Sequence, residues 1–128
     1  MICDLINIRN SARLESMSQM KLLFDMICLK HDFTILGKIE HEFDPQGLSM
    51  IYMLSESHIS VHTFPEKNYL ALDIYTCRNY NDDSVYMEIY RELVNWFDCD
   101  EGLPTIVSRG VRPSIDRVGS WCGHKSGL

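Results

Sequence analysis

Serine, histidine and cysteine, the side chains of nucleophilic and acid–base chemistry, recur on neighbouring segments in the middle of the chain. The short links between these segments imply strands that pair antiparallel. If Phe64 faces Tyr69 across one such link, Cys77 lies beside Glu56 and Ser57. A serine hydroxyl or a cysteine thiol can act as a nucleophile. The pattern therefore indicates a site at the end of this hairpin.

The preceding hairpin adds a histidine to the same region. With a three-residue turn after Leu54, the register brings Ser49 next to His62 and Thr63. The two hairpins would then gather serine, histidine and cysteine. Spacing alone leaves a second interpretation open, in which the serines and the threonine are ordinary polar positions on a half-exposed strand and the histidines are solvated.

Hydrophobic periodicity predicts the elements that must position these groups. Alternating apolar side chains predict strands at residues 2–8, 33–43, 48–54, 58–64 and 69–77, and an edge strand at residues 105–111. Apolar residues at helical spacing predict helices over residues 14–29 and 82–97. We expect Asn10 or Ser11 to cap the first helix and Asn81 to cap the second. Gly37 is expected to mark a bend or bulge in its strand.

This order of elements is typical of an α+β fold, a two-layer α/β sandwich in which an antiparallel sheet is covered on one face by two helices. A length of 128 residues suits a single domain over residues 1–128. We expect residues 113–128 to form a flexible tail. The uncovered face of the sheet predicts a homodimer that buries sheet against sheet.

Composition argues against several classes of function. The chain has 12 basic and 18 acidic residues, a net charge of −6, which argues against a nucleic-acid partner. No apolar run approaches the roughly 18 residues that span a bilayer, and no signal segment is evident, so we expect no membrane partner and a cytoplasmic location. Five cysteines without a CxxC pair predict neither a disulfide framework nor a metal site.

A longer motif gives the central residues a family context. Residues 54–66, LSESHISVHTFPE, and residues 72–77, LDIYTC, resemble the self-cleaving S-adenosylmethionine decarboxylase proenzymes of the short prokaryotic type. The upstream segment FDPQGLS is similar to the same pattern, and the close match covers residues 41–77. Two positions depart from the pattern, because Phe64 stands where tryptophan is common and Arg78 stands where glycine commonly follows the cysteine.

The resemblance implies an enzyme that makes its own cofactor. By analogy, Ser57 Oγ attacks the carbonyl carbon of Glu56, and the resulting ester splits the chain into residues 1–56 and 57–128. Ser57 then becomes a pyruvoyl group, whose ketone supplies the electron sink that decarboxylation of an α-amino acid needs. The implied substrate is S-adenosylmethionine, the product is the aminopropyl donor for spermidine synthesis, and Cys77 matches the residue that protonates the substrate carbon.

The same resemblance implies roles for five other residues. Ser49 and His62 match the donor for the developing oxyanion and the base for the Cα proton. Phe43 and Phe64 match two aromatic rings that stack on adenine. Glu66 matches the carboxylate that accepts hydrogen bonds from the ribose hydroxyls.

Alternatives to this interpretation remain open. One is a pyruvoyl-dependent ornithine or arginine decarboxylase on the same scaffold, and another is an uncleaved, non-catalytic paralogue. Arg78 could lower the pKa of the neighbouring thiol or contact a carboxylate. Ser57 and His62 are five residues apart and would point to opposite faces of a regular strand, so we expect a distortion at Ser57 or reach from across the turn.

Overall fold

The computed structural model describes residues 1–110, which form a five-stranded sheet and two α-helices. In chain order the elements are β1 (Ile2–Leu5), the 3-10 helix η1 (Ser11–Leu14), α1 (Met17–Lys30), β2 (Ile35–Glu42), β3 (Leu48–Leu54), β4 (Ser57–Phe64), the 3-10 helix η2 (Pro65–Lys67), β5 (Tyr69–Tyr75) and α2 (Ser84–Phe97). The predicted flexible tail at residues 113–128 lies outside the described residues. Within them, no helix has the length and apolar character that crossing a membrane requires.

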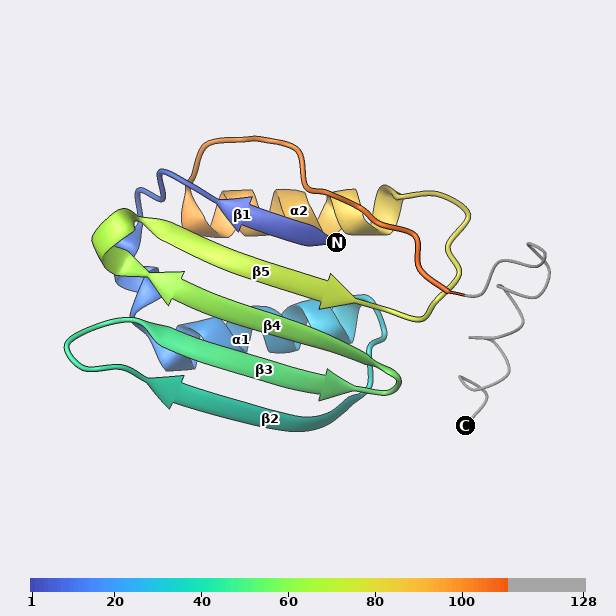
Figure 1. The fold of residues 1–128 in the computed structure, drawn as a ribbon, viewed down its shortest axis with the longest axis horizontal. Coiled ribbons are helices and arrows are strands. Elements are labelled where there is room, and N and C mark those ends of the chain that lie inside the picture. Colours follow the sequence, from blue (N-terminus) through green and yellow to red (C-terminus); the bar gives the residue numbers. More distant parts are fainter. Residues whose placement is uncertain (111–128) are drawn as a thin grey trace.

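The sheet is antiparallel throughout, with the strand order β1-β5-β4-β3-β2. Both α-helices lie on one side of it, α1 behind β3 and β4 and α2 behind β1 (Figure 1). The side that faces the viewer in Figure 1 is called the open face below. The structure therefore confirms the predicted α+β, two-layer sandwich.

The core lies between the sheet and the helices because successive side chains of a strand point to opposite faces. In β3, every second side chain is buried, namely Leu48, Met50, Tyr52 and Leu54. The helical side chains that meet the sheet are also buried, and they include Met20, Phe24 and Ile27 of α1 and Ile89, Leu93 and Phe97 of α2. Burying each such side chain contributes roughly 1.5–3 kcal/mol to the stability of the fold. The packing between sheet and helices therefore holds the strands in position.

The starts of both helices differ from the prediction. Ser16 caps α1, since its Oγ accepts a hydrogen bond from the Gln19 amide at 3.3 Å, and the residues after Asn10 form η1 instead. Serine and asparagine cap helices equally well, so propensity did not separate them. α2 begins three residues after Asn81, following an Asp83 N-cap without a side-chain cap bond. Neither Asn10 nor Asn81 therefore caps an α-helix.

The outer strands are shorter than predicted. β1 ends at Leu5 rather than at residue 8, and the predicted edge strand at residues 105–111 is reduced, within its described part, to a bridge between Thr105 and Ile2. Two backbone hydrogen bonds of 2.8 and 2.9 Å make that bridge. The predicted irregularity at Gly37 is confirmed by a register shift between Ile35 and Gly37.

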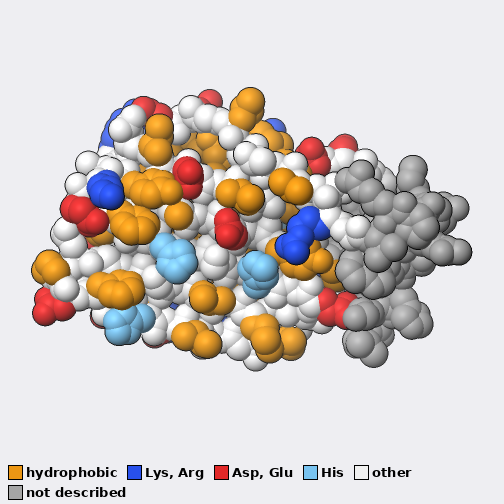
Figure 2. Space-filling model, in the orientation of Figure 1, with side chains coloured by type: hydrophobic (Ala, Val, Ile, Leu, Met, Phe, Trp, Pro, Cys, Tyr) orange, Lys and Arg blue, Asp and Glu red, His pale blue; other side chains and the backbone are white. Residues whose placement is uncertain are grey.

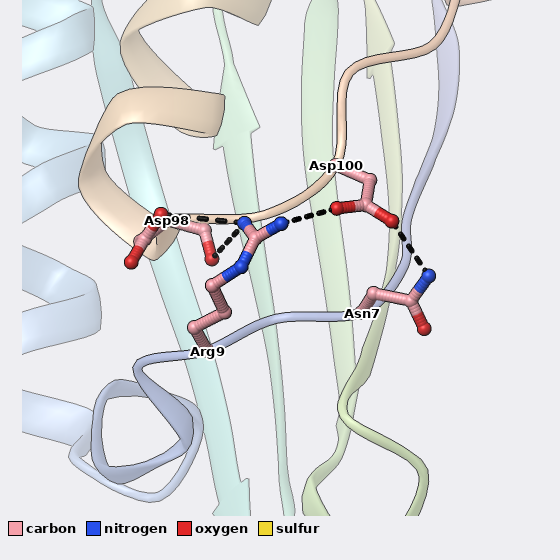
Figure 3. A network of polar contacts seen from close by, with 4 residues as sticks. All are labelled: Asn7, Arg9, Asp98 and Asp100. Carbon is pink, nitrogen blue, oxygen red and sulfur yellow. Dashed lines mark hydrogen bonds and ion pairs between the residues drawn. The ribbon is translucent and has the colours of Figure 1, made fainter.

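A polar network ties the segment after β1 to the segment after α2 (Figure 3). The Arg9 guanidinium lies 3.3 Å from Asp98 Oδ1 and 2.5 Å from Asp100 Oδ1, and Asn7 Nδ2 donates to the Asp100 carboxylate at 2.7 Å. The Arg9 and Asp98 side chains are more than half exposed, so each pair contributes about 0–1 kcal/mol. The network orients these two segments more than it stabilises the fold.

Candidate active site

The turn between β3 and β4 contains two residues, Ser55 and Glu56, rather than the three expected. Leu54 pairs directly with Ser57, which is therefore the first residue of β4. Glu56 has a φ of 58°, in the left-handed region. A non-glycine residue in this region costs about 1–2 kcal/mol, so the peptide bond before Ser57 follows a strained residue.

Cys77 lies where the register predicted it, next to Glu56 and Ser57. Its backbone N–H donates to Ser57 Oγ at 3.2 Å, and its Sγ lies 3.8 Å from Glu56 Oε2. The β4–β5 pairing that brings it there runs from Phe64 opposite Tyr69, as expected from the short connection. Glu56, Ser57 and Cys77 are called the Ser57 group below.

The Arg78 guanidinium is directed towards the end of α1. It donates to the backbone carbonyl oxygens of His31, at 3.0 Å, and of Asp32, and its Cζ lies 5.3 Å from the centre of the Phe33 ring. Contact with a carboxylate was one of two possibilities for Arg78, and backbone carbonyl oxygens take that place because the end of α1 presents them within reach of the guanidinium. Arg78 anchors the segment after Cys77 to α1.

A cavity of about 390 Å³ adjoins Cys77. His58 and Tyr75, which are paired residues of β4 and β5, form part of its wall on the open face. Residues 106–109 close another side, and the Cζ atom of Arg109 lies 4.6 Å from the centre of the Tyr75 ring. Burial raises the pKa of Tyr80, a further wall residue, and the nearby Arg78 guanidinium opposes that shift. The volume falls within the roughly 300–1,000 Å³ typical of small-molecule sites.

Sequence analysis missed this cavity because its walls come from parts of the chain far apart in sequence. Spacing alone leaves His58 as a solvated histidine of a half-exposed strand, and Arg109 belongs to no recognisable motif. The pairing of His58 with Tyr75 was the one available signal, since it follows from the same register that placed Cys77.

Ser49 and His62 face each other across β3 and β4, and Ser49 Oγ lies 2.6 Å from His62 Nδ1. The register expected from a three-residue turn placed both His62 and Thr63 next to Ser49. Thr63 is instead buried on the helix side, where its hydroxyl donates to the Leu14 carbonyl oxygen at 2.8 Å and accepts from the Leu48 amide at 2.9 Å. The one-residue difference follows from the shorter turn.

The three residues expected to recognise the substrate lie at the same end of the sheet as His62. Phe64 ends β4 and stacks on Tyr69, with ring centres 5.4 Å apart and planes 17° apart. Phe43 follows β2 and is 51% exposed. Glu66 lies in η2 and accepts a hydrogen bond from Gln46 Nε2 at 3.2 Å. The His62 group, as named below, comprises Phe43, Ser49, His62, Phe64 and Glu66.

One chain does not bring the two groups together. Ser57 and His62 are five positions apart on β4, which is about 16 Å along a strand. The burial pattern of β4 alternates regularly, with His62 on the open face and Ile59 and Val61 on the helix side. Ser57 is paired in the ladder from the start, so the distortion expected there is absent from its strand pairing. The irregular residue is Glu56, and it does not move Ser57 towards His62.

The fold matches that of a decarboxylase of known structure. The crystal structure of the adenosylmethionine decarboxylase from Aquifex aeolicus VF5 superposes with a TM-score of 0.65 over 87% of this chain and 92% of that chain. Sequence identity is 19%, so the likeness concerns the fold alone. The family model for S-adenosylmethionine decarboxylase matches residues 1–99. The chain belongs to the S-adenosylmethionine decarboxylase family.

Similar sequences are named as proenzymes. S-adenosylmethionine decarboxylase proenzyme 2 of Bacillus cereus is 45% identical over 65 residues, which cover 44% of this chain and 53% of the relative. Proenzyme 1 of the same organism is 35% identical over 83 residues, covering 65% and 64%. The proenzyme of Clostridium botulinum (strain Loch Maree) is 41% identical over 68 residues, covering 53% and 59%. The chain thus spans about half to two thirds of the length of these relatives.

Proposed function

We propose that the chain cleaves itself between Glu56 and Ser57 and then decarboxylates S-adenosylmethionine, giving the aminopropyl donor for spermidine synthesis. The observation that carries the proposal is the geometry of the Ser57 group, in which a strained Glu56 precedes a serine whose hydroxyl is held by the Cys77 amide. Family membership and the names of the relatives support the same reaction. The cleavage would yield residues 1–56 and 57–128.

The proposed cleavage needs only groups of this chain and water. Ser57 Oγ attacks the carbonyl carbon of Glu56, and the peptide nitrogen leaves as an amine to give an ester. Loss of the Ser57 Cα proton then breaks the Cβ–Oγ bond, releasing the Glu56 carboxylate and leaving a dehydroalanine. Addition of water and loss of ammonia convert this residue to a pyruvoyl group. Relief of the left-handed Glu56 conformation favours the bond breaking, because the residue becomes a free chain end.

The surroundings of Ser57 suit a pyruvoyl group at that position. The group would supply a ketone that accepts electrons as CO2 leaves the substrate. Oγ itself would leave with the Glu56 carboxylate, and the Cys77 amide that lies 3.2 Å from it is a hydrogen-bond donor beside the carbon that would carry the ketone. The Cys77 thiol borders the cavity and is positioned to give a proton to the substrate carbon. The amino-acid part of the substrate would occupy that cavity.

A second copy of the chain would complete the site. The open face bears exposed apolar side chains, with Ile39 73%, Met53 57% and Ile51 43% exposed. Hydrophobic and histidine side chains are spread across this face (Figure 2). If two sheets pack face to face about a two-fold axis through the middle of the sheet, the sheet end with the His62 group in one copy lies against the sheet end with the Ser57 group in the other, and Ser57, which shares the helix-side parity of Ile59 and Val61, meets it from the end of its strand. In that homodimer His62 serves as the base, Phe43 and Phe64 stack on adenine, and Glu66 binds the ribose hydroxyls.

The alternative of an ornithine or arginine substrate has one observation in its favour. Three aspartates, Asp73, Asp82 and Asp83, line the cavity and would attract a basic side chain. They share it with Arg78 and Arg109, so the cavity is not uniformly acidic. Assays of CO2 release from S-adenosylmethionine, ornithine and arginine decide between the two substrate classes, and release from a basic amino acid alone would contradict the first proposal.

Intact mass of the purified full-length protein tests self-cleavage. We expect two chains that correspond to residues 1–56 and 57–128, the second carrying a carbonyl that reacts with hydroxylamine. Ser57→Ala should remain one chain without that carbonyl, whereas Ser60→Ala, a serine of the same strand, should be cleaved like the wild type. A wild-type protein that stays uncut and unreactive would favour the uncleaved, non-catalytic paralogue.

A further inference from the structure

Three side chains from the two helices converge on the side of the molecule away from the open face. His31 is the C-cap residue of α1, and Glu88 and Glu92 lie one turn apart on α2. One ligand atom of each residue lies within 4.8 Å of those of the other two. A nitrogen and two carboxylates from separate helices thus point to a common centre.

The His31 ring is the feature that distinguishes this cluster from ordinary surface acids. Its side chain is 7% exposed, and Nε2 is buried without a hydrogen-bond partner among the described residues. The nearest carboxylate oxygen, Glu92 Oε1, is 3.6 Å away, which is beyond hydrogen-bond distance. Buried polar atoms are nearly always paired, so an unpaired imidazole nitrogen aimed at two carboxylates indicates a missing partner.

We propose that His31, Glu88 and Glu92 bind a divalent transition-metal ion of the Zn²⁺ class. One imidazole and two carboxylates form a ligand set that Zn²⁺ accepts, with a fourth position left for water. Two ligands about 2.0–2.1 Å from a tetrahedral ion lie roughly 3.4 Å apart. The 3.6 Å between His31 Nε2 and Glu92 Oε1 is close to that separation. Small rotations of the Glu88 side chain, which is 48% exposed, would bring in the third ligand.

In this structure the Lys30 ammonium contacts the two carboxylates that would bind the metal ion. Its Nζ lies 3.0 Å from Glu88 Oε1 and 2.5 Å from Glu92 Oε1. The Lys30 side chain is 54% exposed and carries a flexible stem, so it can withdraw into solvent when a stronger cation arrives. Because its ammonium leaves His31 Nε2 unpaired, Lys30 neutralises the carboxylates without satisfying the whole cluster.

The proposed site is separate from the Ser57 group but borders the segment that follows it. The carbonyl oxygen of His31 accepts a hydrogen bond from Arg78, the residue after Cys77. A metal ion would join the end of α1 to α2 at the point where Arg78 is anchored. The site therefore adds a cross-link to the helical layer beside the candidate active site.

Titration of the full-length, chelator-treated protein with ZnCl2, followed by calorimetry and thermal unfolding, tests the proposal. We expect one Zn²⁺ per chain and a Tm that rises by about 5 °C or more at saturating Zn²⁺. His31→Ala, Glu88→Gln and Glu92→Gln should each weaken binding at least about tenfold through loss of a ligand. Lys30→Gln should tighten binding several-fold, because the competing ammonium is gone. A purely structural ion-pair cluster predicts no such gain.

Matched controls separate this site from other zinc-binding groups. His41→Ala removes an exposed histidine that is flanked by Glu40 and Glu42, and it should leave the affinity unchanged. Co²⁺ in place of Zn²⁺ should give visible bands without the near-ultraviolet absorption of a cobalt–thiolate bond, which excludes the cysteines. Absence of binding, unchanged affinity in Glu88→Gln, a thiolate signal, or Lys30→Gln binding no tighter than the wild type would each overturn the proposal.

Discussion

The two ends of the β3–β4 hairpin hold their functional side chains in different ways. Ser49 and His62 are held by regular strand pairing, which sets them directly opposite each other at hydrogen-bond distance. Ser57 also pairs in the ladder, but it directly follows a two-residue turn with a left-handed Glu56, and its hydroxyl is contacted by Cys77 from the segment after β5. Strand pairing holds Ser49 and His62 in a fixed geometry. The strained conformation of Glu56 instead favours rearrangement of the peptide bond between Glu56 and Ser57.

This difference suits the proposed division of labour. A base and a hydrogen-bond donor benefit from a fixed geometry, because their function is to hold and move protons at defined positions. The peptide bond before Ser57 must instead break, and the new chain ends must separate. If the two ends belong to one site, they must come from two copies of the chain, since about 16 Å of strand separates them in one copy.

The largest expected effect comes from mixing two inactive variants. Ser57→Ala lacks the proposed cleavage serine and His62→Ala lacks the proposed base, so each alone should show almost no decarboxylation. Co-expression should restore activity, because a mixed homodimer contains one site with an intact Ser57 group and an intact His62 group. Random pairing predicts about a quarter of the wild-type number of sites. CO2 release per chain measures the result, and no restoration would show that both groups act within one chain.

His62→Ala alone should slow self-cleavage and catalysis by about 10²–10⁴-fold, the usual contribution of a positioned acid–base group. The rate of chain cleavage, followed by intact mass over time, checks the first effect. His41→Ala provides the matched control, because His41 also lies on the open face, opposite Ser49 in the β2–β3 pairing. Equal rates in the two variants would contradict a specific role for His62.

Glu66→Gln should act on substrate binding and leave self-cleavage unchanged. A carboxylate that accepts hydrogen bonds from two hydroxyls contributes about 1.5–3 kcal/mol, so we expect kcat/KM for S-adenosylmethionine to fall roughly 10–100-fold. The Gln46 side chain now donates to Glu66 at 3.2 Å, and Gln46→Ala is the control that removes this neighbour without removing the carboxylate. A cleavage defect in Glu66→Gln would place Glu66 in the processing reaction instead.

The register of β4 and β5 could be predicted from the sequence, because a short connection and regular alternation leave one pairing that keeps the apolar side chains in the core. The β3–β4 register was wrong by one residue. A two-residue turn there needs Glu56 in a left-handed conformation, and glutamate carries no sequence signal for that. The turn was therefore the one place in the hairpin where local propensity misled the prediction.

The contacts between distant segments were beyond sequence reasoning for a different reason. The cavity wall at Arg109 and the His31–Glu92 approach depend on how the helices and the later chain pack, and no spacing rule links such residues. The cysteine pattern alone predicted the absence of a metal site, and it carries no information about a histidine and two glutamates. Their one local signal was the one-turn spacing of Glu88 and Glu92 on a predicted helix.

The smallest expected effect concerns a contact between α1 and the middle of the sheet. This contact lies between the two ends of the hairpin, so a substitution there is compared with the substitutions at either end. Asp25 of α1 accepts a hydrogen bond from Tyr52 Oη at 2.6 Å and lies 2.8 Å from Lys38 Nζ. Burial raises the pKa of the Asp25 carboxyl, but the hydrogen bonds from Lys38 and Tyr52 outweigh it and leave the pKa below its ordinary 3.8. The ionised carboxylate therefore stabilises the fold above the ordinary pKa, and this contribution is lost as the pH falls through the lower, folded-state pKa.

Asp25→Asn should thus lower Tm by about 2–4 °C at pH 7, since the carboxylate is 43% exposed and solvent screening limits the pair to roughly 1 kcal/mol or less. Thermal unfolding of both proteins from pH 7 to pH 3 should show the difference shrinking towards zero below pH 3.8. Because Asp25 contacts neither group, cleavage and substrate affinity should stay at wild-type values. A pH-independent difference would mean that packing, not charge, holds α1 to the sheet here, and altered cleavage would mean that the Ser57 group depends on the whole helical layer rather than on its own turn.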